Sequence, residues 1–298
     1  MRRRFTTLDV FTNQRFAGNP LAVVQDAQGL NGAAMQTIAR EFNLPETVFV
    51  LPASERAHRA QLRIFTPAME LPFAGHPTVG AAVLLGLKEG ASSVDLVFEE
   101  QIGPVRCRFA RTADDVGHAA FDVPGTPEYV GRAGDAAAIA AALSLTIDDL
   151  GCGAFELGRW KAGNTFAMIP VRGLDAIGRA RPDLSRWAVA FGNAPPRSAF
   201  LFCAETEDGN HAYRARMFAP DMGIAEDPAT GSAVAAFAGV AAKFADLADG
   251  EHVLVIEQGY EMGRPSLLNL TVTLQAGALA GASIAGDAIV VSEGTIEA

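Results

Sequence analysis

The chain has 298 residues, of which 49% are hydrophobic and 19% are charged, so it can bury one large domain or two modest ones. Its 34 acidic and 24 basic residues give a net charge of −10, which disfavours nucleic acid and anionic membranes as partners. The longest apolar runs fall short of the roughly 18 residues that a membrane span needs. The first residues are too polar for a signal-peptide core, and the three cysteines are too widely spaced for a disulfide or zinc pattern. We therefore expect a cytoplasmic protein without a metal site.

The first part of the chain predicts alternating strands and helices. A turn that runs into a buried strand is predicted over Ala17–Val24, and apolar residues at helical spacing predict an amphipathic helix ending near Phe42. Strand-like segments follow at Pro45–Leu51 and Arg63–Phe65. A proline-containing loop then opens a long apolar run over Ala81–Leu87.

The second part of the chain repeats this order in diverged form. Ala162–Ile169 has the pattern of the first strand 145 residues later, and Leu184–Phe191 has the spacing of an amphipathic helix. Strand-like segments at Pro196–Phe202 and Arg216–Phe218 follow at offsets of 151 and 153 residues. A second apolar run covers Ala233–Ala242. An internal repeat of this length predicts two halves of similar construction.

The two apolar runs determine the expected fold. A segment that is apolar on every side suits a fully buried helix, and the length and small residues of these runs favour a helix over the alternative, a buried strand. We therefore expect an α+β fold of two pseudo-symmetric halves, each a curled mixed β-sheet around a central helix. The first half is placed at residues 1–124, joined by a C-terminal strand at 287–298, and the second half at 125–286. The active site is expected between the halves.

The loops that open the two runs contain residue types that suit both structure and chemistry. His76 and Asp227 each precede a proline, which is favoured in the first turn of a helix. Thr230 and Ser232 are typical helix-capping residues, and capping alone is one interpretation of them. The other interpretation is that free backbone N–H groups at the positive end of a buried helix bind a carboxylate or phosphate.

The glycines of these loops favour the second interpretation. Gly75 and Gly231 would let a ligand approach the backbone closely. His76 lies inside this motif, where a helix N-terminus disfavours the charged imidazole and suits a neutral hydrogen-bonding or proton-relaying ring. The other histidines lie in polar surroundings and are interpreted as surface residues: His58, His118, His211 and His252.

Glu46 is the most informative acidic residue. It lies between Pro45, which ends the first amphipathic helix, and an apolar strand. Such a carboxylate is ordinarily solvated or caps a helix. However, the repeat places Arg197 at the corresponding position, so the two halves differ there. A carboxylate directed into a cleft between the halves would be a natural general acid/base, with its pKa raised by partial burial.

Several common catalytic motifs are absent from the sequence. The glycines of Gly151–Gly158 have the wrong spacing for dinucleotide binding, and no phosphate-binding loop, His-Glu-x-x-His or Gly-x-Ser-x-Gly occurs. Nicotinamide, ATP, zinc and serine-hydrolase chemistry are therefore not first choices, and no cofactor is expected.

Four motifs together resemble the phenazine-biosynthesis isomerase (PhzF-like) family. They lie at Phe11–Val24, Leu44–Phe49, Phe65–Gly80 and Gly223–Ser232, and the resemblance extends from about Leu8 to Pro265. It implies a diaminopimelate-epimerase-like fold. It also implies the founding activity of the family, which moves a proton along a short conjugated system of a dihydro-hydroxyanthranilate without a cofactor.

The resemblance also implies roles for individual residues. The catalytic glutamate of the family falls on Glu46, its accompanying histidine on His76 and its aspartate on Asp227. Its helix-mouth glycine and serine fall on Gly231 and Ser232, which are expected to bind substrate. Two further residues complete the set of substrate-binding candidates: Asn19 and Gly75. Five further residues are candidates for the pocket lining: Met69, Glu70, Phe73, Tyr213 and Met222. Core packing explains the apolar ones among them equally well.

The expected function is that of a cofactor-independent isomerase acting by general acid/base catalysis on a small carboxylate. Related epimerases use a cysteine at each helix mouth, and neither mouth here has a thiol, so two-thiol racemisation is excluded. An epimerase or lyase in the same cleft and a non-catalytic binder of small acids remain as alternatives. Similar proteins are often dimers, so a homodimer is expected, with no nucleic acid or membrane partner.

Overall fold

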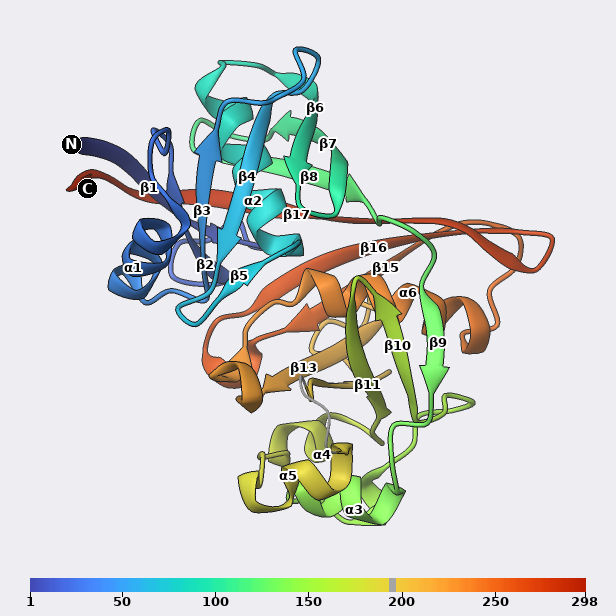
Figure 1. The fold of residues 1–298 in the computed structure, drawn as a ribbon. Helices are drawn as coiled ribbons and strands as arrows, with labels where there is room; N and C mark the ends of the chain where they lie inside the picture. Colours follow the sequence, from blue (N-terminus) through green and yellow to red (C-terminus); the bar gives the residue numbers. More distant parts are fainter. Residues whose placement is uncertain (193–196) are drawn as a thin grey trace. The chain divides into compact units, whose positions relative to one another are not determined.

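The computed structural model describes residues 1–192 and 197–298, which form two compact units (Figure 1). Unit 1 comprises Met1–Asp122 and Ala285–Ala298, and unit 2 comprises Val123–Ile284. Pro196, at the start of one predicted strand segment, lies outside the described residues.

Unit 1 combines a mixed β-sheet with one buried and one surface helix. Its elements are β1 (Arg2–Val10), β2 (Asn19–Val24), α1 (Gly32–Phe42), β3 (Glu46–Leu51), β4 (Ala60–Phe65), β5 (Glu70–Leu71), α2 (Gly75–Lys88), β6 (Ser93–Glu100), β7 (Gly103–Arg111), β8 (Val116–Asp122) and the second part of β17 (Ala278–Glu297).

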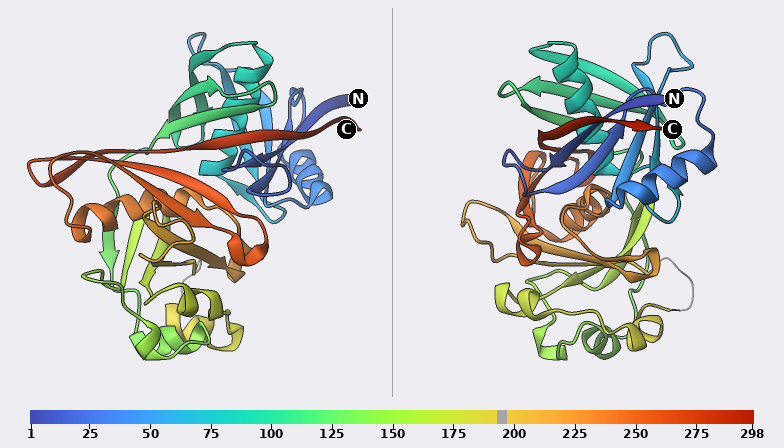
Figure 2. Two further views of the ribbon diagram at one scale, coloured as in Figure 1. Left: turned by 180° about the vertical axis from the view of Figure 1, so that it is seen from behind. Right: turned by 90° about the vertical axis from the view of Figure 1, so that its left-hand side faces the viewer.

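The strands of unit 1 close around α2. β2 pairs with β3 and β4 with β6 in parallel, whereas β1–β2, β3–β4, β4–β5, β6–β7 and β7–β8 are antiparallel. β17 pairs antiparallel with β1 and also pairs with β8, which joins the two ends of the sheet. The pairing of β1 with β17 brings the N- and C-terminal ends of the chain side by side (Figure 2).

Helix α2 is buried from Gly75 to Gly86, as expected for a run that is apolar on every side. It packs against β1, β2, β3, β6, β7 and β8. A Cβ atom at Gly80 would lie 2.4 Å from Cδ2 of Leu21 and 2.9 Å from Cγ2 of Val10. Glycine is therefore required there for the helix to approach β1 and β2. The prediction of a buried helix over Ala81–Leu87 is confirmed.

Helix α1 covers the outer face of the same sheet. Met35 and Ala39, on one face of the helix, pack with Phe49 and Phe65 of β3 and β4. Asn31 caps the helix through its side chain, and it ends at Asn43 in a left-handed conformation. The amphipathic pattern predicted for this segment thus corresponds to a helix that covers the second face of the sheet.

Unit 2 is built in the same general way, with more helices. Its elements are β9 (Glu128–Gly131), α3 (Ala136–Ala142), η1 (Ile147–Asp149), β10 (Gly158–Ala162), β11 (Asn164–Pro170), α4 (Leu174–Arg179), α5 (Leu184–Phe191), β12 (Ala199–Cys203), β13 (Tyr213–Ala219), η2 (Pro220–Met222), β14 (Ile224–Asp227), α6 (Gly231–Phe244), β15 (Gly250–Gln258), η3 (Tyr260–Met262), β16 (Ser266–Gln275) and the first part of β17.

The sheet of unit 2 also has helices on two faces. β11–β12 and β13–β15 are parallel, and β9–β10, β10–β11, β12–β13, β13–β14 and β15–β16 are antiparallel. On one face, Phe200 and Phe202 pack on Phe237 of the buried helix α6. On the other, Leu201 packs in a core cluster that includes Trp187 of the amphipathic helix α5. This alternation is that of a strand buried on both faces, and the second long run is also confirmed as a helix.

Matching carboxylates fix a loop in each unit. Glu99 accepts two backbone N–H groups and contacts His58, and Glu257 does the same with two backbone N–H groups and His211. The backbone hydrogen bonds lower the pKa of Glu99 to about 2. The interpretation of His58 and His211 as surface residues was wrong, because both rings are largely covered and held by these carboxylates.

The residue after each carboxylate contacts the first turn of the buried helix or its cap. Oε1 of Glu100 lies 2.7 Å from the hydroxyl of Thr78, which is also 2.8 Å from the carbonyl oxygen of Ala74. A threonine hydroxyl has one proton, so a protonated Glu100 satisfies both contacts by donating to Thr78. Burial raises the pKa of Glu100 to about 8, which favours this neutral form. In unit 2, Gln258 donates an amide N–H to the hydroxyl of Thr230 at 2.9 Å.

The substitution Glu100→Gln is expected to stabilise the protein at neutral and alkaline pH. Glu100 ionises near 4.5 when unfolded and near 8 when folded, so folding of the wild type becomes less favourable as pH rises through this interval. Below the unfolded value the two proteins should be similar, because both side chains are neutral. Above about pH 8 the variant should be more stable by several kcal/mol, as measured by urea unfolding, because each unit of difference in pKa corresponds to about 1.4 kcal/mol.

Glu99→Gln is the matched control, since it makes the same change at the adjacent residue. Its lowered pKa means that the folded state favours the ionised carboxylate, so the variant should be destabilised at neutral pH. That destabilisation should disappear as pH falls toward 2. Equal responses of the two variants to pH would show that Glu100 is not held neutral.

Candidate active site

His76 lies in the first turn of α2 and contacts two strands of unit 1. The residue is 3% exposed, and its ring donates a hydrogen bond to the carbonyl oxygen of Pro20 in β2. Nδ1 lies 3.2 Å from Oε2 of Glu46, the first residue of β3. The parallel pairing of β2 and β3 places Leu21 opposite Glu46, so the sheet register itself brings the carboxyl group to the ring.

The environment of His76 keeps its ring neutral. Burial lowers its pKa to about 3, and the hydrogen bond to Pro20 opposes this shift only in part. The contact with Glu46 is therefore one between a carboxyl group and a neutral imidazole rather than an ion pair. Nε2 is buried and has no hydrogen-bond partner among the described residues, so Nδ1 holds the proton and Nε2 is an acceptor.

The remaining candidates of unit 1 are found beside this pair in the chain or the sheet. Asn19 is fully buried at the start of β2, next to the proline whose carbonyl binds His76. Gly75 is the first residue of α2. Glu46 itself is 9% exposed. The structure thus brings Glu46 and His76 into contact, with Gly75 directly before the histidine.

Unit 2 holds the other catalytic candidate, Asp227, in a polar cluster. Asp227 ends β14 and is 6% exposed, and the hydroxyl of Thr230 donates to its carboxylate at 2.6 Å. Gln258 donates to the hydroxyl of Thr230 and, at 2.8 Å, to the backbone carbonyl of Asp227. The amide of Gln258 also accepts the backbone N–H of Thr230. The hydroxyl of Thr230 therefore orients Asp227, and capping is not its role.

Both buried helices begin without a side-chain cap in the described part of the chain. α2 follows Ala74, and α6 follows Thr230, whose hydroxyl is engaged with Asp227. Gly231 and Ser232 form the start of α6, and Ser232 is 8% exposed. The positive end of each helix dipole thus lies in the interior of its unit, where it can act on a bound anion with little screening.

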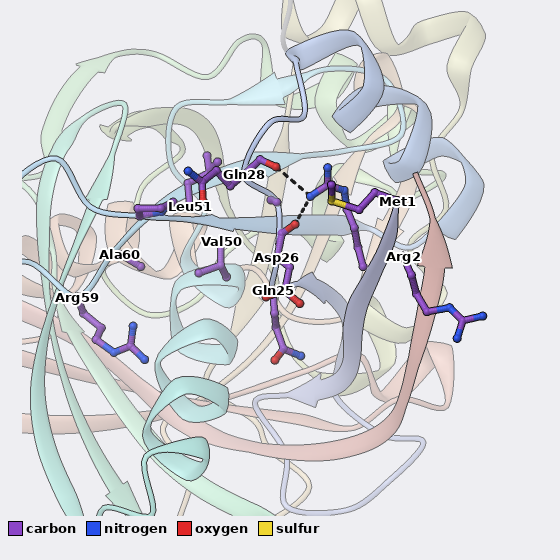
Figure 3. Close-up of a pocket in the computed structure, with 12 residues that line it drawn as sticks. Met1, Arg2, Gln25, Asp26, Gln28, Val50, Leu51, Arg59 and Ala60 are labelled. Carbon is purple, nitrogen blue, oxygen red and sulfur yellow. Dashed lines mark hydrogen bonds between the residues drawn. The ribbon is translucent and has the colours of Figure 1, made fainter.

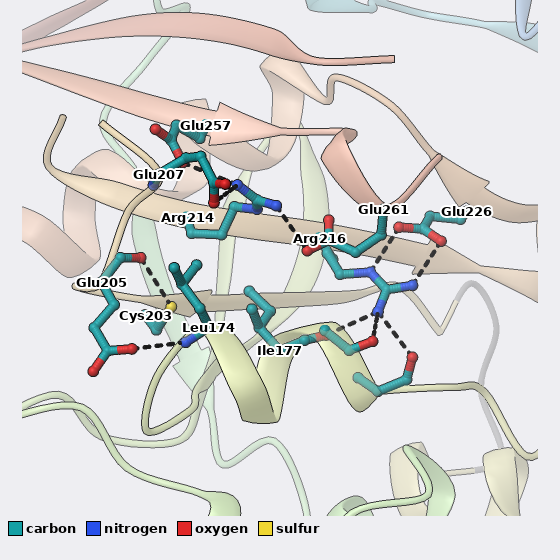
Figure 4. A network of polar contacts seen from close by, with 12 residues as sticks. Leu174, Ile177, Cys203, Glu205, Glu207, Arg214, Arg216, Glu226, Glu257 and Glu261 are labelled. Atoms are coloured by element: carbon teal, nitrogen blue, oxygen red, sulfur yellow. Dashed lines mark hydrogen bonds and ion pairs between the residues drawn. The ribbon is translucent and has the colours of Figure 1, made fainter. Parts of the chain in front are cut away.

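An arginine–glutamate pair anchors the segment that leads to each helix. Arg63 of β4 binds Glu70 of β5 through two hydrogen bonds of 2.7 Å. In unit 2, Arg216 binds Glu226 through bonds of 2.7 and 2.8 Å and also donates to backbone carbonyls at the end of α4 (Figure 4). Because a bidentate pair fixes both partners geometrically, each clamp helps to position the loop that carries His76 or Asp227.

The correspondence of Glu46 with Arg197 was wrong by one residue. β3 pairs Thr47 with Ala22, and β12 pairs Ala199 with Ala167, the residue that the repeat matches to Ala22. Ser198 therefore occupies the position of Glu46 in the sheet register. A shift of one residue reverses the face of a strand, which is why an alignment without structure could not locate it. The acidic residue still has no acidic counterpart, since serine stands in its place.

Sequence reasoning missed the residues that support the candidates. Gln258 and Glu100 end matching strands and contact the helix starts, but nothing in their immediate sequence marks them. Arg63 and Arg216 are the first residues of the matching segments Arg63–Phe65 and Arg216–Phe218, and this repetition was a signal of a shared role.

Some of the residues suggested for the pocket lining belong to the hydrophobic core. Phe73 is 2% exposed and packs edge-on against Phe121. Tyr213 packs against Phe237 of the buried helix α6. For these two residues, core packing is the correct interpretation, whereas Glu70 belongs to the clamp with Arg63.

Two further observations concern metal binding and membrane-spanning helices. No group of three or more His, Cys, Asp or Glu side chains within residues 1–192 and 197–298 has an arrangement that could hold a metal ion. None of the helices described in these ranges combines the length and the apolar character that crossing a membrane requires.

Known proteins resemble the chain over nearly its whole length. The family model described as phenazine biosynthesis-like protein (PhzC-PhzF) matches residues 8–294. An uncharacterised isomerase of Mesorhizobium japonicum is 46% identical over 99% of this chain and 98% of its own length. The trans-2,3-dihydro-3-hydroxyanthranilate isomerase of Pseudomonas fluorescens is 33% identical over 98% of both chains.

Solved structures show the same relationship. A PhzF-family protein of Bacillus anthracis aligns with a TM-score of 0.90 and 28% identity over the full length of both chains. A hydroxyproline epimerase of Agrobacterium vitis aligns with a TM-score of 0.65 and 11% identity over 99% of this chain and 92% of its own. The second likeness concerns the fold alone.

The state of His76 can be measured directly. We expect ¹⁵N NMR to show a neutral ring protonated on Nδ1 throughout the range from about pH 5 to pH 8, because burial holds the pKa near 3. The variant His76→Gln assigns the resonances by their loss. Titration of this ring near the ordinary value of 6.5 would contradict the geometry described above.

Proposed function

The chain belongs to the phenazine biosynthesis-like protein family, and on this premise we propose that it is an isomerase that moves a proton within a small carboxylate substrate. The proposed general acid/base is Glu46, and no cofactor takes part. The observation that carries the proposal is the buried carboxyl group of Glu46, 3.2 Å from a neutral imidazole. Relatives named as isomerases of trans-2,3-dihydro-3-hydroxyanthranilate support this reaction class.

The proposed reaction needs a single base. Glu46 removes a proton from a carbon atom next to an unsaturated or carbonyl-activated group, and the electron pair of the broken C–H bond moves into the conjugated system. The carboxylic acid so formed returns the proton to a carbon atom farther along that system. Substrate and product therefore have the same composition, and Glu46 ends in its starting state. The same carboxyl group thus serves first as general base and then as general acid.

His76 has the properties of a hydrogen-bonding partner in this scheme. Its ring is neutral, and its Nε2 acceptor has no partner among the described residues. A hydroxyl or amino group of the substrate could donate to Nε2, which would hold the reacting carbon near Glu46. We propose the same orienting role for Asp227, whose carboxylate is fixed by the hydroxyl of Thr230.

The substrate carboxylate is proposed to bind at the helix starts. Gly75, Gly231 and Ser232 contribute backbone N–H groups where neither helix has a side-chain cap in the described ranges. This local field matters because a net charge of −10 provides no general attraction for an anion. Asn19, buried at the start of β2, is proposed as a further substrate contact.

The proposal extends to the arrangement of the whole chain. We propose a diaminopimelate-epimerase-like fold of two pseudo-symmetric halves that act on one substrate, with Glu46 and His76 from the first and Asp227 and Ser232 from the second. The matched strand pairings and the matched carboxylates of Glu99 and Glu257 support an origin of the halves by repetition. A cytoplasmic homodimer without nucleic acid or membrane partners stays a prediction.

A second candidate reaction is favoured by one observation. Asp227 is a second buried carboxylate, and an epimerase would need two bases, one for each face of the reacting carbon. Turnover in deuterium oxide separates the two reactions. Intramolecular return by one shielded base predicts little deuterium in the product, whereas exchange through two bases predicts extensive incorporation.

The role of Glu46 is tested by Glu46→Gln. The substrate is found first by a thermal-shift screen of small carboxylic acids that includes trans-2,3-dihydro-3-hydroxyanthranilate. On a confirmed substrate, kcat should fall by about 10²–10⁴-fold, because the amide can neither accept nor return the proton. Glu41→Gln, on the exposed surface of α1, is the matched control and should keep full activity. Turnover by Glu46→Gln at the rate of the wild type would overturn the proposed mechanism.

A further inference from the structure

A pocket of about 550 Å³ lies in unit 1 at the end of β3 remote from Glu46 (Figure 3). Glu46 begins this strand and Leu51 ends it, so the pocket is roughly 15 Å from the His76–Glu46 pair at the usual rise per residue. The pocket is formed by the start of β1, the turn after β2, the end of β3 and the start of β4. Its lining residues are Met1, Arg2, Arg3, Gln25, Asp26, Ala27, Gln28, Val50, Leu51, Pro52, Arg59 and Ala60.

Arg3 is the unusual residue of this pocket. It is only 6% exposed, yet its partners are the backbone carbonyl oxygens of Asp26 and Gln28, both bound by Nη1. Nε has no hydrogen-bond partner among the described residues. No carboxylate in the described ranges lies within ion-pair distance of this guanidinium. Arg3 is thus a buried cation held by neutral oxygen atoms.

The other charged groups that line the pocket already have partners. Arg2 pairs with Glu297, and Arg59 pairs with Glu89. The carboxylate of Asp26 is bound by Arg4 at 2.8 and 3.0 Å. The charge of Arg3 therefore remains uncompensated. Burying a charge without a counter-ion is costly, and two carbonyl dipoles replace only part of its hydration.

The opposite side of the pocket is apolar. Leu51 of β3 lines it on the face of the sheet that also carries Phe5 of β1, and Ala27 lies in the turn between Asp26 and Gln28, whose carbonyl oxygens bind Arg3. A pocket with one cationic end and an apolar wall fits a molecule with an anionic head and an apolar body. The planar guanidinium forms paired hydrogen bonds with carboxylate or phosphate oxygens through its free N–H groups.

We propose that this pocket is a binding site for a small organic oxyanion, with its carboxylate or phosphate group on Arg3 and its apolar part against Leu51 and Ala27. The site is separate from the residues assigned to catalysis, and it does not depend on the reaction proposed for them. Bound oxyanion supplies the counter-charge that the described protein groups do not provide.

Arginine-detected NMR of the full-length protein tests the proposal with defined probes. Benzoate and phenyl phosphate represent the two head groups, and benzyl alcohol is the uncharged control at equal ionic strength. The Nε–Hε resonance of Arg3, assigned by its loss in Arg3→Gln, should shift saturably with one or both anions and not with benzyl alcohol. This readout reports on Arg3 itself, so binding of a carboxylate near Glu46 does not mimic it. The stronger of the two anions identifies the preferred head group.

Two variants and a control complete the test. Gln28→Glu changes an exposed residue that lines the pocket and places an internal carboxylate near Arg3, so the fold should persist while anion affinity falls by roughly tenfold or more. Arg3→Gln should lower the affinity, measured by calorimetry, to a similar degree. Arg108→Gln removes an exposed arginine outside the pocket and should leave it unchanged. Absence of a saturable shift at millimolar anion, or unchanged affinity in Gln28→Glu, would show that Arg3 only ties β1 to the turn after β2.

Discussion

The complete burial of a helix start is the constraint on which the candidate site depends. α2 is apolar on every side, so the sheet of unit 1 encloses it and its first turn lies in the interior. Burial of that turn removes water from His76, which makes the ring neutral, and the register of β2 and β3 places Glu46 against it. The same burial leaves Glu100 protonated beside Thr78. The burial of this one helix start thus sets the protonation states of both His76 and Glu100.

Unit 2 meets the same constraint with different side chains. α6 is also buried at its start, but the residue at the end of the neighbouring strand is Gln258. Its amide N–H donates a hydrogen bond at any pH, whereas Glu100 must be protonated to do so. The hydroxyl partner of Gln258, Thr230, directs its own proton to Asp227. Thus an imidazole is held neutral at the start of α2, and a carboxyl group is fixed by a hydroxyl group at the start of α6. The two arrangements supply an acceptor of protons in each unit, although only the first places a carboxyl group against a histidine.

The sequence predicted the parts of this picture that depend on local pattern. The long apolar runs identified both buried helices, and the spacing from Met35 to Phe42 identified the helix that covers the outer face of the sheet. Register could not be read in the same way, because strands of alternating burial look alike when shifted by one residue, and Arg197 was matched to Glu46 in place of Ser198. Partners remote in sequence, such as Thr230 and Gln258, follow from strand pairing and leave no local signal.

The corrected register strengthens the argument for an asymmetric reaction. A structural carboxylate at the start of β3 would be expected to recur where β12 begins, as Glu99 recurs in Glu257 and Arg63 in Arg216. The residues that hold the loops and form the arginine–glutamate pairs are thus of the same type in both units, and they make the same contacts there. Glu46 differs, since Ser198 stands at its position. Glu100 also lacks an acidic counterpart, since Gln258 takes its place, but it contacts a threonine hydroxyl, whereas Glu46 lies against the neutral ring of His76. A single carboxyl group in that position is what the proposed reaction with one base requires.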